Sequence, residues 1–480
     1  MRLSAVRNRN LSLWQSAVSE IADRLVTENP ALMKAMQQAA SLHAVAAFKG
    51  FDIPPPAAPP AVTATKLSGP RPDPQMLAYV SKLVFEVAQA HQRGDRLGEA
   101  AAMAKLSEFI RPYSTLDIIG WMQCVWYYIQ YYIAAHRDPP YRDWNQQIPP
   151  DINFGVVDYQ LPPNAKILMI GDWGTHMTDN VAMLREGLRK FTPDAVVHLG
   201  DVYYSGTPYE CQQNVLQVMD DLVAELKIKR PPFFTIPGNH EYYSGGVGYF
   251  NIIDNINSGV ALSRQKASYF CLRSADNAWQ FLAMDTGYND RDPVKPAAPG
   301  LQSSEIKWHR DKLDKFTGTT ILLSHHQLFS ANSQLNDSAP NYLNHDLNST
   351  FSPYFDRIAA WFWGHEHNFV VFKDGQSGLK KGRLLGCSAY EETLGEDPYA
   401  IKFPDVGYAP GMTKVGLSPY QGDLEVYYNH AMALLTLSPA KIDVSYYQYP
   451  SWDQEFTPPT VDTPQLLMSE TILPSPPAGV

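Results

Sequence analysis

The chain has 480 residues, of which 45% are hydrophobic and 18% are charged, and its formal net charge is -10. This composition is typical of a soluble globular protein with a large core, built either as about three domains or as one large α/β domain with appendages. The negative charge argues against a nonspecific nucleic-acid surface or an anionic-membrane surface.

The cysteines and the N-terminal segment carry no recognisable signals. The cysteines have no CxxC spacing, so we expect reduced, mostly buried thiols rather than a metal site or a disulfide framework, at Cys124, Cys211, Cys271 and Cys387. Three arginines precede LSLWQSAVSEIA, but polar residues interrupt that stretch, so it is not the apolar core of a signal peptide. We therefore expect a cytoplasmic protein.

The first 150 residues predict an α-helical appendage. Apolar residues recur at helical spacing over 14–25 and 32–42, and further helices are expected over 76–110 and 116–135. The proline-dense segment 53–74 is predicted to be an extended connector. We expect this region to pack on the domain that follows or to bind a protein partner.

Residues 116–135 have nearly the length of a membrane-spanning helix, which is about 20 residues. However, Asp117, Gln123, Gln130 and several tyrosines make a lipid environment costly for this stretch. A buried or interface helix is therefore favoured, and no membrane span is expected.

From Lys166 the pattern changes to short apolar runs, each followed by a glycine or a polar cluster. Such runs are typical of strands buried on both faces of a sheet, and they cover 166–170, 195–199, 233–236, 279–284 and 319–324. Helical patterns lie between them, over 180–191, 209–227 and 304–316. Together they predict a layered α/β domain over about 160–450.

The end of this domain is predicted to be β-rich. Strands are expected over 369–373, 383–387, 430–437 and 441–447, with the last two joined as a hairpin around Ser438. Residues 388–429 are expected to form long loops near the site. The proline-rich tail, 451–480, is expected to be extended or disordered.

Five polar clusters follow apolar runs, and they are the strongest functional signal in the sequence. They are GDWG at 171–174, GDVYY at 200–204, GNHE at 238–241, SHH at 324–326 and GHEH at 364–367. Ligands of open α/β sheets gather beyond the carboxyl ends of the strands, which is where each cluster falls. The five clusters therefore predict one site built from strand ends.

The residue types in these clusters favour a pair of metal ions. The oxygen donors and the imidazoles together suit first-row transition metals, and they are Asp172, Asp201, Asn239, His325, His365 and His367. Two ions about 3.5–4 Å apart can clamp the attacking and leaving oxygens of a phosphoryl transfer. A single Gly-Asp is usually a turn and a single histidine is usually structural, so the prediction depends on their joint occurrence.

The motifs GDWG, GDVYY, GNHE, SHH and GHEHN resemble those of the calcineurin-like metallophosphoesterases and, within them, the purple acid phosphatases, over about 165–375. The resemblance implies a β-sheet sandwich flanked by helices. Most members of the superfamily have DxH at the first motif, where this chain has Asp172, Trp173 and Gly174. Purple acid phosphatases also lack that histidine and use the tyrosine of GDxxY, which matches Tyr204. Either Tyr204 or the adjacent Tyr203 could instead be a packing aromatic beside an ordinary dimetal centre.

The resemblance also implies a role for each ligand. One ion, Fe(III) in that family, would be bound by Asp172, Tyr204 and His367. A divalent Zn, Mn or Fe would be bound by Asn239, His325 and His365. Asp201 would bridge the two ions.

Three further histidines are candidates for the pocket. By resemblance, His240 contacts the phosphate and protonates the leaving group. His326 lies in a similar place and is a candidate for substrate binding. His176 could reach the pocket from beyond Asp172, although a surface-loop histidine is the other interpretation.

We therefore expect hydrolysis of a small phosphorylated substrate by in-line attack of a metal-bound hydroxide, as in the purple acid phosphatases. Two alternatives stay open from the sequence. One is a dimetal phosphodiesterase or nuclease, which would share every ligand. The other is a noncatalytic interaction protein that acts through its helical N-terminal region.

Overall fold

A computed structural model describes residues 139–144, 154–203, 205–260, 262–290, 299–389, 398–420, 428–452 and 463–475, together with 95, 97, 98 and 101. The predicted helices over 14–25, 32–42 and 116–135 and the connector 53–74 lie outside the described residues. Within the predicted helix 76–110, residues 97, 98 and 101 are helical. The fold below is that of one compact unit, which includes residues 139–242 and 246–480.

The first of two β-sheets in this unit has seven strands. In spatial order they are β1 (Val156–Leu161), β5 (Phe270–Ser274), β6 (Trp279–Ala283), β7 (Thr319–Ser324), β8 (Ile358–Trp363), β10 (Gly382–Leu385) and β9 (Phe369–Val371). Strands β6, β7, β8 and β10 run parallel to one another, whereas β5 and β9 pair antiparallel with β6 and β10.

The second sheet has six strands. Their order is β13 (Gln465–Ile472), β12 (Lys441–Tyr449), β11 (His430–Ser438), β2 (Lys166–Ile170), β3 (Ala195–His198) and β4 (Phe233–Thr235). The pairs β2–β3 and β3–β4 are parallel, and the other pairs are antiparallel. The register of β11 and β12 closes a hairpin between Ser438 and Lys441, as predicted.

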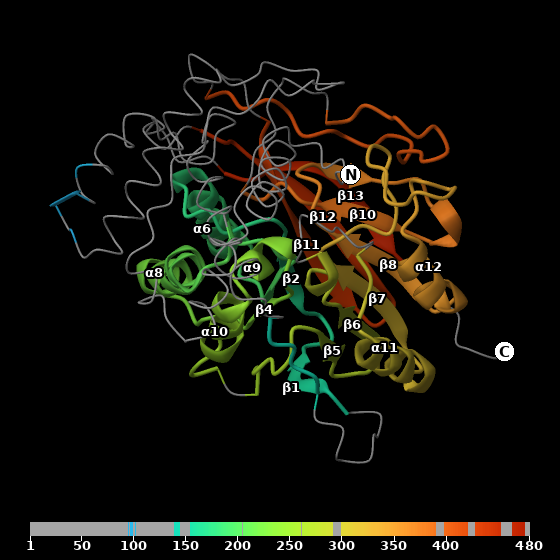
Figure 1. Cartoon of the computed structure of the whole chain (residues 1–480), viewed down its shortest axis with the longest axis horizontal. Helices are drawn as coiled ribbons and strands as arrows, with labels where there is room; N and C mark the ends of the chain where they lie inside the picture. The colour runs from blue at the N-terminus through green and yellow to red at the C-terminus, as the bar shows by residue number, and fades with distance from the viewer. Residues whose placement is uncertain are drawn as a thin grey trace, which may run out of the picture. The chain divides into compact units, whose positions relative to one another are not determined.

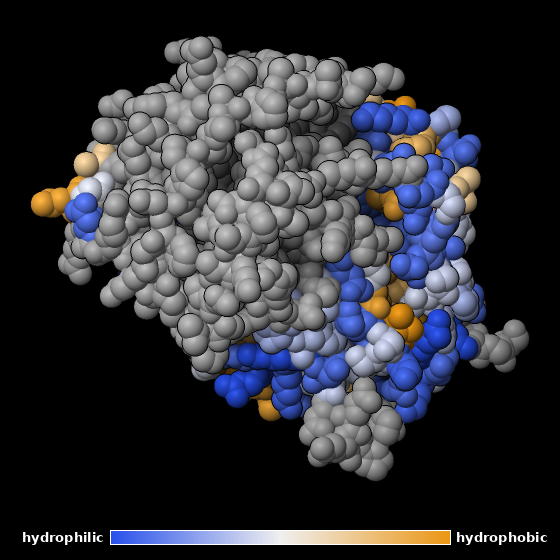
Figure 2. Space-filling model, in the orientation of Figure 1, coloured by the Kyte–Doolittle hydropathy of each residue, from blue (hydrophilic) through white to orange (hydrophobic). Residues whose placement is uncertain are grey.

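Helices flank the two sheets (Figure 1). On one side lie α6 (Thr178–Phe191), α7 (Pro208–Glu210), the π-helix Cys211–Gln217, α8 (Val218–Leu226), α9 (Asn239–Tyr243) and α10 (Val247–Asn255). On the other lie α11 (Ser303–Lys315) and α12 (His345–Phe351), around which hydrophilic residues dominate the described surface in Figure 2. Short 3-10 turns cover Tyr288–Asp290, Ser352–Tyr354 and Gln376–Gly378.

Strand β2 explains why apolar runs form the central strands. Successive side chains of a strand point to opposite faces. Ile167 and Met169 therefore belong to the core that includes side chains of both sheets, whereas Leu168 and Ile170 pack in a second cluster with residues of α6 and α8. A strand that is buried on both faces is therefore a nearly continuous apolar run. The predicted α/β fold, with stacked sheets flanked by helices, is confirmed.

Two parts of the β-structure differ from the sequence-based expectation. Strands β1, β5 and β8 were not predicted, although β8 carries the apolar run before GHEH. The region expected to be a tail contains β13, which pairs along β12, so the six-stranded sheet extends beyond residue 450. Within the described ranges, no helix has the length and apolar character to cross a membrane.

Strand β13 also ties the two sheets together through charge. Arg383 of β10 is almost fully buried, and its Nε donates to Glu470 Oε1 of β13 at 2.6 Å. Tyr446 of β12 donates its hydroxyl to the same oxygen at 2.7 Å. Burial opposes ionisation of Glu470, but the hydrogen bonds from Arg383 outweigh it and lower the pKa of Glu470 to about 2. The ion pair therefore joins a strand of one sheet to an edge strand of the other.

We predict that Glu470→Ala lowers the free energy of unfolding by about 3 kcal/mol, because the buried Arg383 then keeps only the exposed Asp374 as a charge partner. Urea denaturation at neutral pH measures this change. The matched control is Asp443→Ala, which removes an exposed ion pair with Lys441 and is expected to change the free energy by less than about 1 kcal/mol. Equal effects of the two substitutions would contradict this role of Glu470.

Candidate metal centre

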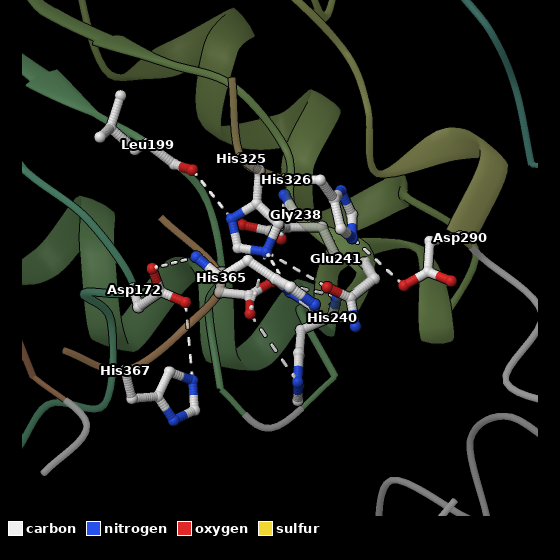
Figure 3. A network of polar contacts seen from close by, with 12 residues as sticks. Asp172, Leu199, Gly238, His240, Glu241, Asp290, His325, His326, His365 and His367 are labelled. Atoms are coloured by element: carbon white, nitrogen blue, oxygen red, sulfur yellow. Dashed lines mark hydrogen bonds and ion pairs between the residues drawn. The ribbon is translucent and has the colours of Figure 1, made fainter. Parts of the chain in front are cut away.

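The predicted ligands meet beyond the carboxyl ends of five strands. Asp172, Asp201 and Asn239 follow β2, β3 and β4 of the six-stranded sheet, while His325 follows β7 of the seven-stranded sheet. His365 and His367 follow β8, also in the seven-stranded sheet. All six are buried, and the stick view shows the labelled ones around one centre (Figure 3). The fold thus brings together residues that lie up to 195 positions apart, from Asp172 to His367.

Three of these residues have left-handed backbone conformations. The φ angles are 54° at Asp172, 68° at Asp201 and 70° at His365. A non-glycine residue in this region costs about 1–3 kcal/mol, and such strain gathers at functional sites. The backbone N–H of Asp172 donates to the Gly200 carbonyl, and that of His365 donates to Asp172 Oδ2, both at 2.9 Å. These bonds hold the turns that direct the side chains into the pocket.

Asp201 and His325 lie at the middle of the group. Asp201 Oδ2 is 3.4 Å from His325 Nε2 and 3.8 Å from His240 Nε2. His325 Nε2 is also 3.2 Å from Asn239 Oδ1 and 3.2 Å from His365 Nδ1. Three atoms, from Asp201, Asn239 and His365, therefore surround the Nε2 of His325.

The orientation of His325 suits a metal ligand. Its Nδ1 lies 2.9 Å from the Leu199 carbonyl oxygen, which can only accept, so Nδ1 carries the proton of this bond. In a singly protonated ring, Nε2 is then the atom with a lone pair, and it faces the carboxylates. Ligating histidines in metal sites are commonly fixed in this way by a hydrogen bond to the other nitrogen.

Burial and charge set the ionisation of the pocket. Burial raises the pKa of Asp172 well above its usual range, and the neighbouring Asp201 adds to this effect. At Asp201, His325 and His240 outweigh burial and hold the pKa well below its usual range. Burial opposes protonation of His325, but Asp201 and Asp172 raise its pKa to about 10. The carboxylates thus favour a positive charge at their centre.

The imidazoles of His326, His365 and His367 are neutral near pH 7. Burial lowers the pKa of His367 to about 3 and lowers the pKa values of His365 and His326 well below the ordinary value. A neutral imidazole has the lone pair that a metal needs. Two groups have ligand atoms within 4.8 Å of one another, namely Asp172, Asp201 and His325, and His325, His326 and His365. The donor set therefore fits metal ions.

A tyrosine hydroxyl completes the carboxylate side of the pocket, and it belongs to Tyr203. It lies 3.2 Å from Asp172 Oδ1, 3.4 Å from Asp201 Oδ2 and 2.8 Å from His367 Nε2. The prediction assigned a ligand to the adjacent Tyr204, which lies outside the described residues, so that assignment stays a prediction. Spacing alone did not identify Tyr203 as a pocket residue.

The three histidines predicted near the ligands have different positions. The backbone N–H of His240 donates to Asp201 Oδ1 at 3.2 Å, and the ring of His240 packs edge-on against Tyr203. His326 packs beside His365, with ring centroids 4.3 Å apart. His176 is exposed, which agrees with the surface-loop interpretation.

Three supporting residues were missed by sequence reasoning. His326 Nδ1 is 2.9 Å from the Thr286 hydroxyl, and its Nε2 is 3.2 Å from Asp290 Oδ2. Asn214, in the π-helix, donates to the carbonyls of Gly174 at 2.9 Å and Tyr203 at 3.1 Å, so it joins the first two motif loops. For Thr286 and Asp290, the only sequence signal is that Thr286 closely follows the predicted strand 279–284.

We predict that Gly238→Ala abolishes metal binding with little loss of secondary structure. An added Cβ would lie 2.7 Å from both Asp201 Cγ and His325 Nε2, so two central ligands would have to move. Elemental analysis and circular dichroism after purification in metal-supplemented buffer measure the two properties. At Gly407 an added Cβ meets only Lys373 atoms at 3.8 Å, so Gly407→Ala should keep its metal. Retention of metal in Gly238→Ala would contradict the assigned centre.

The chain is similar in part to several solved structures. No curated protein matches the chain. Similar solved structures include GAP50, the anchor in the inner membrane complex of Plasmodium, with 11% identity, TM-score 0.42, and coverage of 65% of this chain and 89% of that chain. A dimetal phosphatase from Danio rerio has 14% identity, TM-score 0.38, and coverage of 65% and 99%. PhoD has 12% identity, TM-score 0.38, and coverage of 66% and 73%.

The family comparison covers all five motif clusters. Residues 165–369 match the family described as calcineurin-like phosphoesterase. This range begins just before β2 and ends at the first residue of β9. It contains every described residue that we predicted as a metal ligand. Residues 165–369 are therefore similar to a calcineurin-like phosphoesterase domain.

Proposed function

We propose that this protein hydrolyses phosphate monoesters at a dimetal centre of the purple acid phosphatase type. The observation that carries the proposal is the burial of two carboxylates, an amide and three histidines in one pocket at the ends of five strands. The calcineurin-like phosphoesterase match over the same residues supports metal-dependent phosphoester hydrolysis.

The arrangement of donors supports two adjacent metal positions. Asp172, His367 and the phenol of a tyrosine would hold one ion, and Asn239, His325 and His365 would hold the other. Asp201 Oδ2 lies 3.4 Å from both the Tyr203 hydroxyl and His325 Nε2, so one carboxylate faces both groups of donors. This position is the reason for assigning Asp201 as the bridging ligand.

When bound, the two ions would supply a water of lowered pKa and offset the charge of the phosphoryl oxygens. The protein itself would orient the ester and deliver a proton. His240 is placed for this work because its Nε2 lies beside Asp201 at 3.8 Å and its ring is held against Tyr203. An imidazole can transfer a proton near neutral pH. We assign His240 to the phosphate and the leaving group, and His326 to the same wall of the pocket.

A tyrosine ligand would decide the identity of the first ion. A phenolate is a hard, anionic oxygen ligand that favours Fe(III), so the proposed pair is Fe(III) with a divalent Zn, Mn or Fe. A phosphodiesterase or nuclease would use the same ligands, but no contact among the described residues favours a diester.

We predict that His240→Ala lowers kcat for phenyl phosphate, whose leaving group needs a proton, about 100-fold or more while both metals stay bound, since general acid catalysis contributes about that much. Asp201→Asn should lose metal and activity together. The measurements are steady-state kinetics and elemental analysis, with His176→Ala as the control because that histidine is exposed. A His240→Ala protein that loses a metal would contradict its assigned role.

The same assay distinguishes the ester classes. We expect p-nitrophenyl phosphate to be hydrolysed faster than bis-p-nitrophenyl phosphate, and both rates should disappear after chelation and return with added metal. A higher rate on the diester would replace the proposed monoesterase with a phosphodiesterase. No hydrolysis of either ester by the metal-loaded protein would overturn the proposed function.

We predict that the iron-loaded protein has a visible tyrosinate absorption band that Tyr203→Phe removes, because the Tyr203 hydroxyl lies among Asp172, Asp201 and His367. Tyr204→Phe is the matched comparison. If Tyr204→Phe removes the band and Tyr203→Phe keeps it, the ligand is the residue that the GDxxY spacing selects. An active protein without any band would be a dimetal phosphatase outside the purple acid type.

A further inference from the structure

Two buried carboxyl groups beside the metal pocket are not used by the proposed reaction. Asp285 follows β6, and Glu305 lies in the first turn of α11; both are almost completely buried. The backbone N–H of Asp285 donates to Glu305 Oε1 at 2.8 Å. Burial raises the pKa of Asp285 to about 7 and that of Glu305 to about 8, with the charge of Glu305 also raising that of Asp285. Neither residue belongs to a candidate metal group among the described residues.

Asp285 connects the helix that carries His240 with the turn that carries Asp290, the partner of His326. Its Oδ2 accepts a hydrogen bond from the Tyr242 hydroxyl at 2.5 Å, and Tyr242 lies on α9 two positions after His240. Its Oδ1 accepts from the backbone N–H of Tyr288 at 3.0 Å. Tyr288 opens the 3-10 turn that ends at Asp290, the partner of His326. One carboxyl group therefore contacts both α9 and the turn Tyr288–Asp290.

Glu305, which accepts the backbone hydrogen bond of Asp285, extends this network further. Its Oε2 accepts a hydrogen bond from the Tyr141 hydroxyl, and its Oε1 lies 3.1 Å from His309 Nε2. The ring of Tyr141 packs edge-on against that of Tyr288 at 4.9 Å. The ring of Tyr288 in turn meets that of Tyr242 edge-on at 5.4 Å. The three tyrosines and the two buried carboxyls form one connected network.

The two supported segments are too short to be rigid by themselves. Helix α9 has five residues, and the turn Tyr288–Asp290 has three. Short helices are marginal without tertiary contacts. A displacement of a catalytic group by about 1 Å can cost about 100-fold in rate. The side-chain and backbone bonds to Asp285 are therefore well placed to fix the positions of His240 and His326.

We propose that Asp285 is a positioning residue that fixes two histidines relative to the metal pocket. It acts on His240 through Tyr242, and on His326 through Tyr288 and Asp290. The inference rests on the proposed function, because it concerns delivery of the proton to the leaving group. It assigns no contact between Asp285 and the substrate.

The test compares two esters that differ in their need for that proton. Phenolate leaves less easily than p-nitrophenolate, so phenyl phosphate depends more on protonation by a histidine. We expect Asp285→Asn and Tyr242→Phe to lower kcat for phenyl phosphate about fivefold more than kcat for p-nitrophenyl phosphate. The bound metals should remain, since neither residue is a proposed ligand. Tyr242→Phe removes only one hydroxyl, so it keeps the test valid if Asp285→Asn folds poorly.

Tyr446→Phe is the matched control. It also removes a buried hydroxyl that donates to a carboxylate, but its partner is Glu470 on β13, so the ratio of the two rates should stay unchanged. An equal loss on both esters in Tyr242→Phe, or loss of a metal from it, would overturn the positioning role and leave the proposed function standing. If the unmutated protein hydrolyses neither ester, the proposed function fails and this inference fails with it.

Discussion

The burial of Asp172 and Asp201 in one pocket is the constraint on which the rest of the site depends. Two carboxylates removed from water repel each other and are each costly to ionise. The structure places a nearly complete set of nitrogen and oxygen donors around them and raises the pKa of His325 to about 10. The pocket therefore favours positive charge, and metal ions would meet that requirement more fully than one imidazolium.

The fold produces this pocket by stacking two sheets whose parallel strands end at the same edge. Strands buried on both faces supply the rigid frame, and the chain turns sharply where each strand ends. At Asp172, Asp201 and His365 the turn is made in the left-handed region without glycine. Strained turns persist only where surrounding contacts hold them. Here the contacts are the hydrogen bonds of those turns, the two bonds from Asn214 and the network around Asp285.

Sequence reasoning predicted most of the central strands and six candidate metal ligands that the fold brings together, because both have local signatures. An apolar run such as KILMI specifies a doubly buried strand, and a polar cluster at its end specifies a side chain at the sheet edge. Strands β1 and β13 carry polar residues in their runs, VVDYQL and QLLMSETI, and so lack that signature. The GDVYY motif could not show that the Tyr203 ring lies in the pocket, because the motif holds two adjacent tyrosines and the sequence does not give the direction of either side chain. Asn214, Asp285 and Glu305 act through contacts between distant segments, which no spacing reveals.

Anomalous X-ray diffraction from crystals of the metal-loaded protein tests the central claim most directly. We expect two metal peaks about 3.5–4 Å apart, one on each side of the Asp201 carboxylate. Asp172 and His367 should contact one peak, and Asn239, His325 and His365 should contact the other. A single peak, or peaks away from Asp201, would contradict the account.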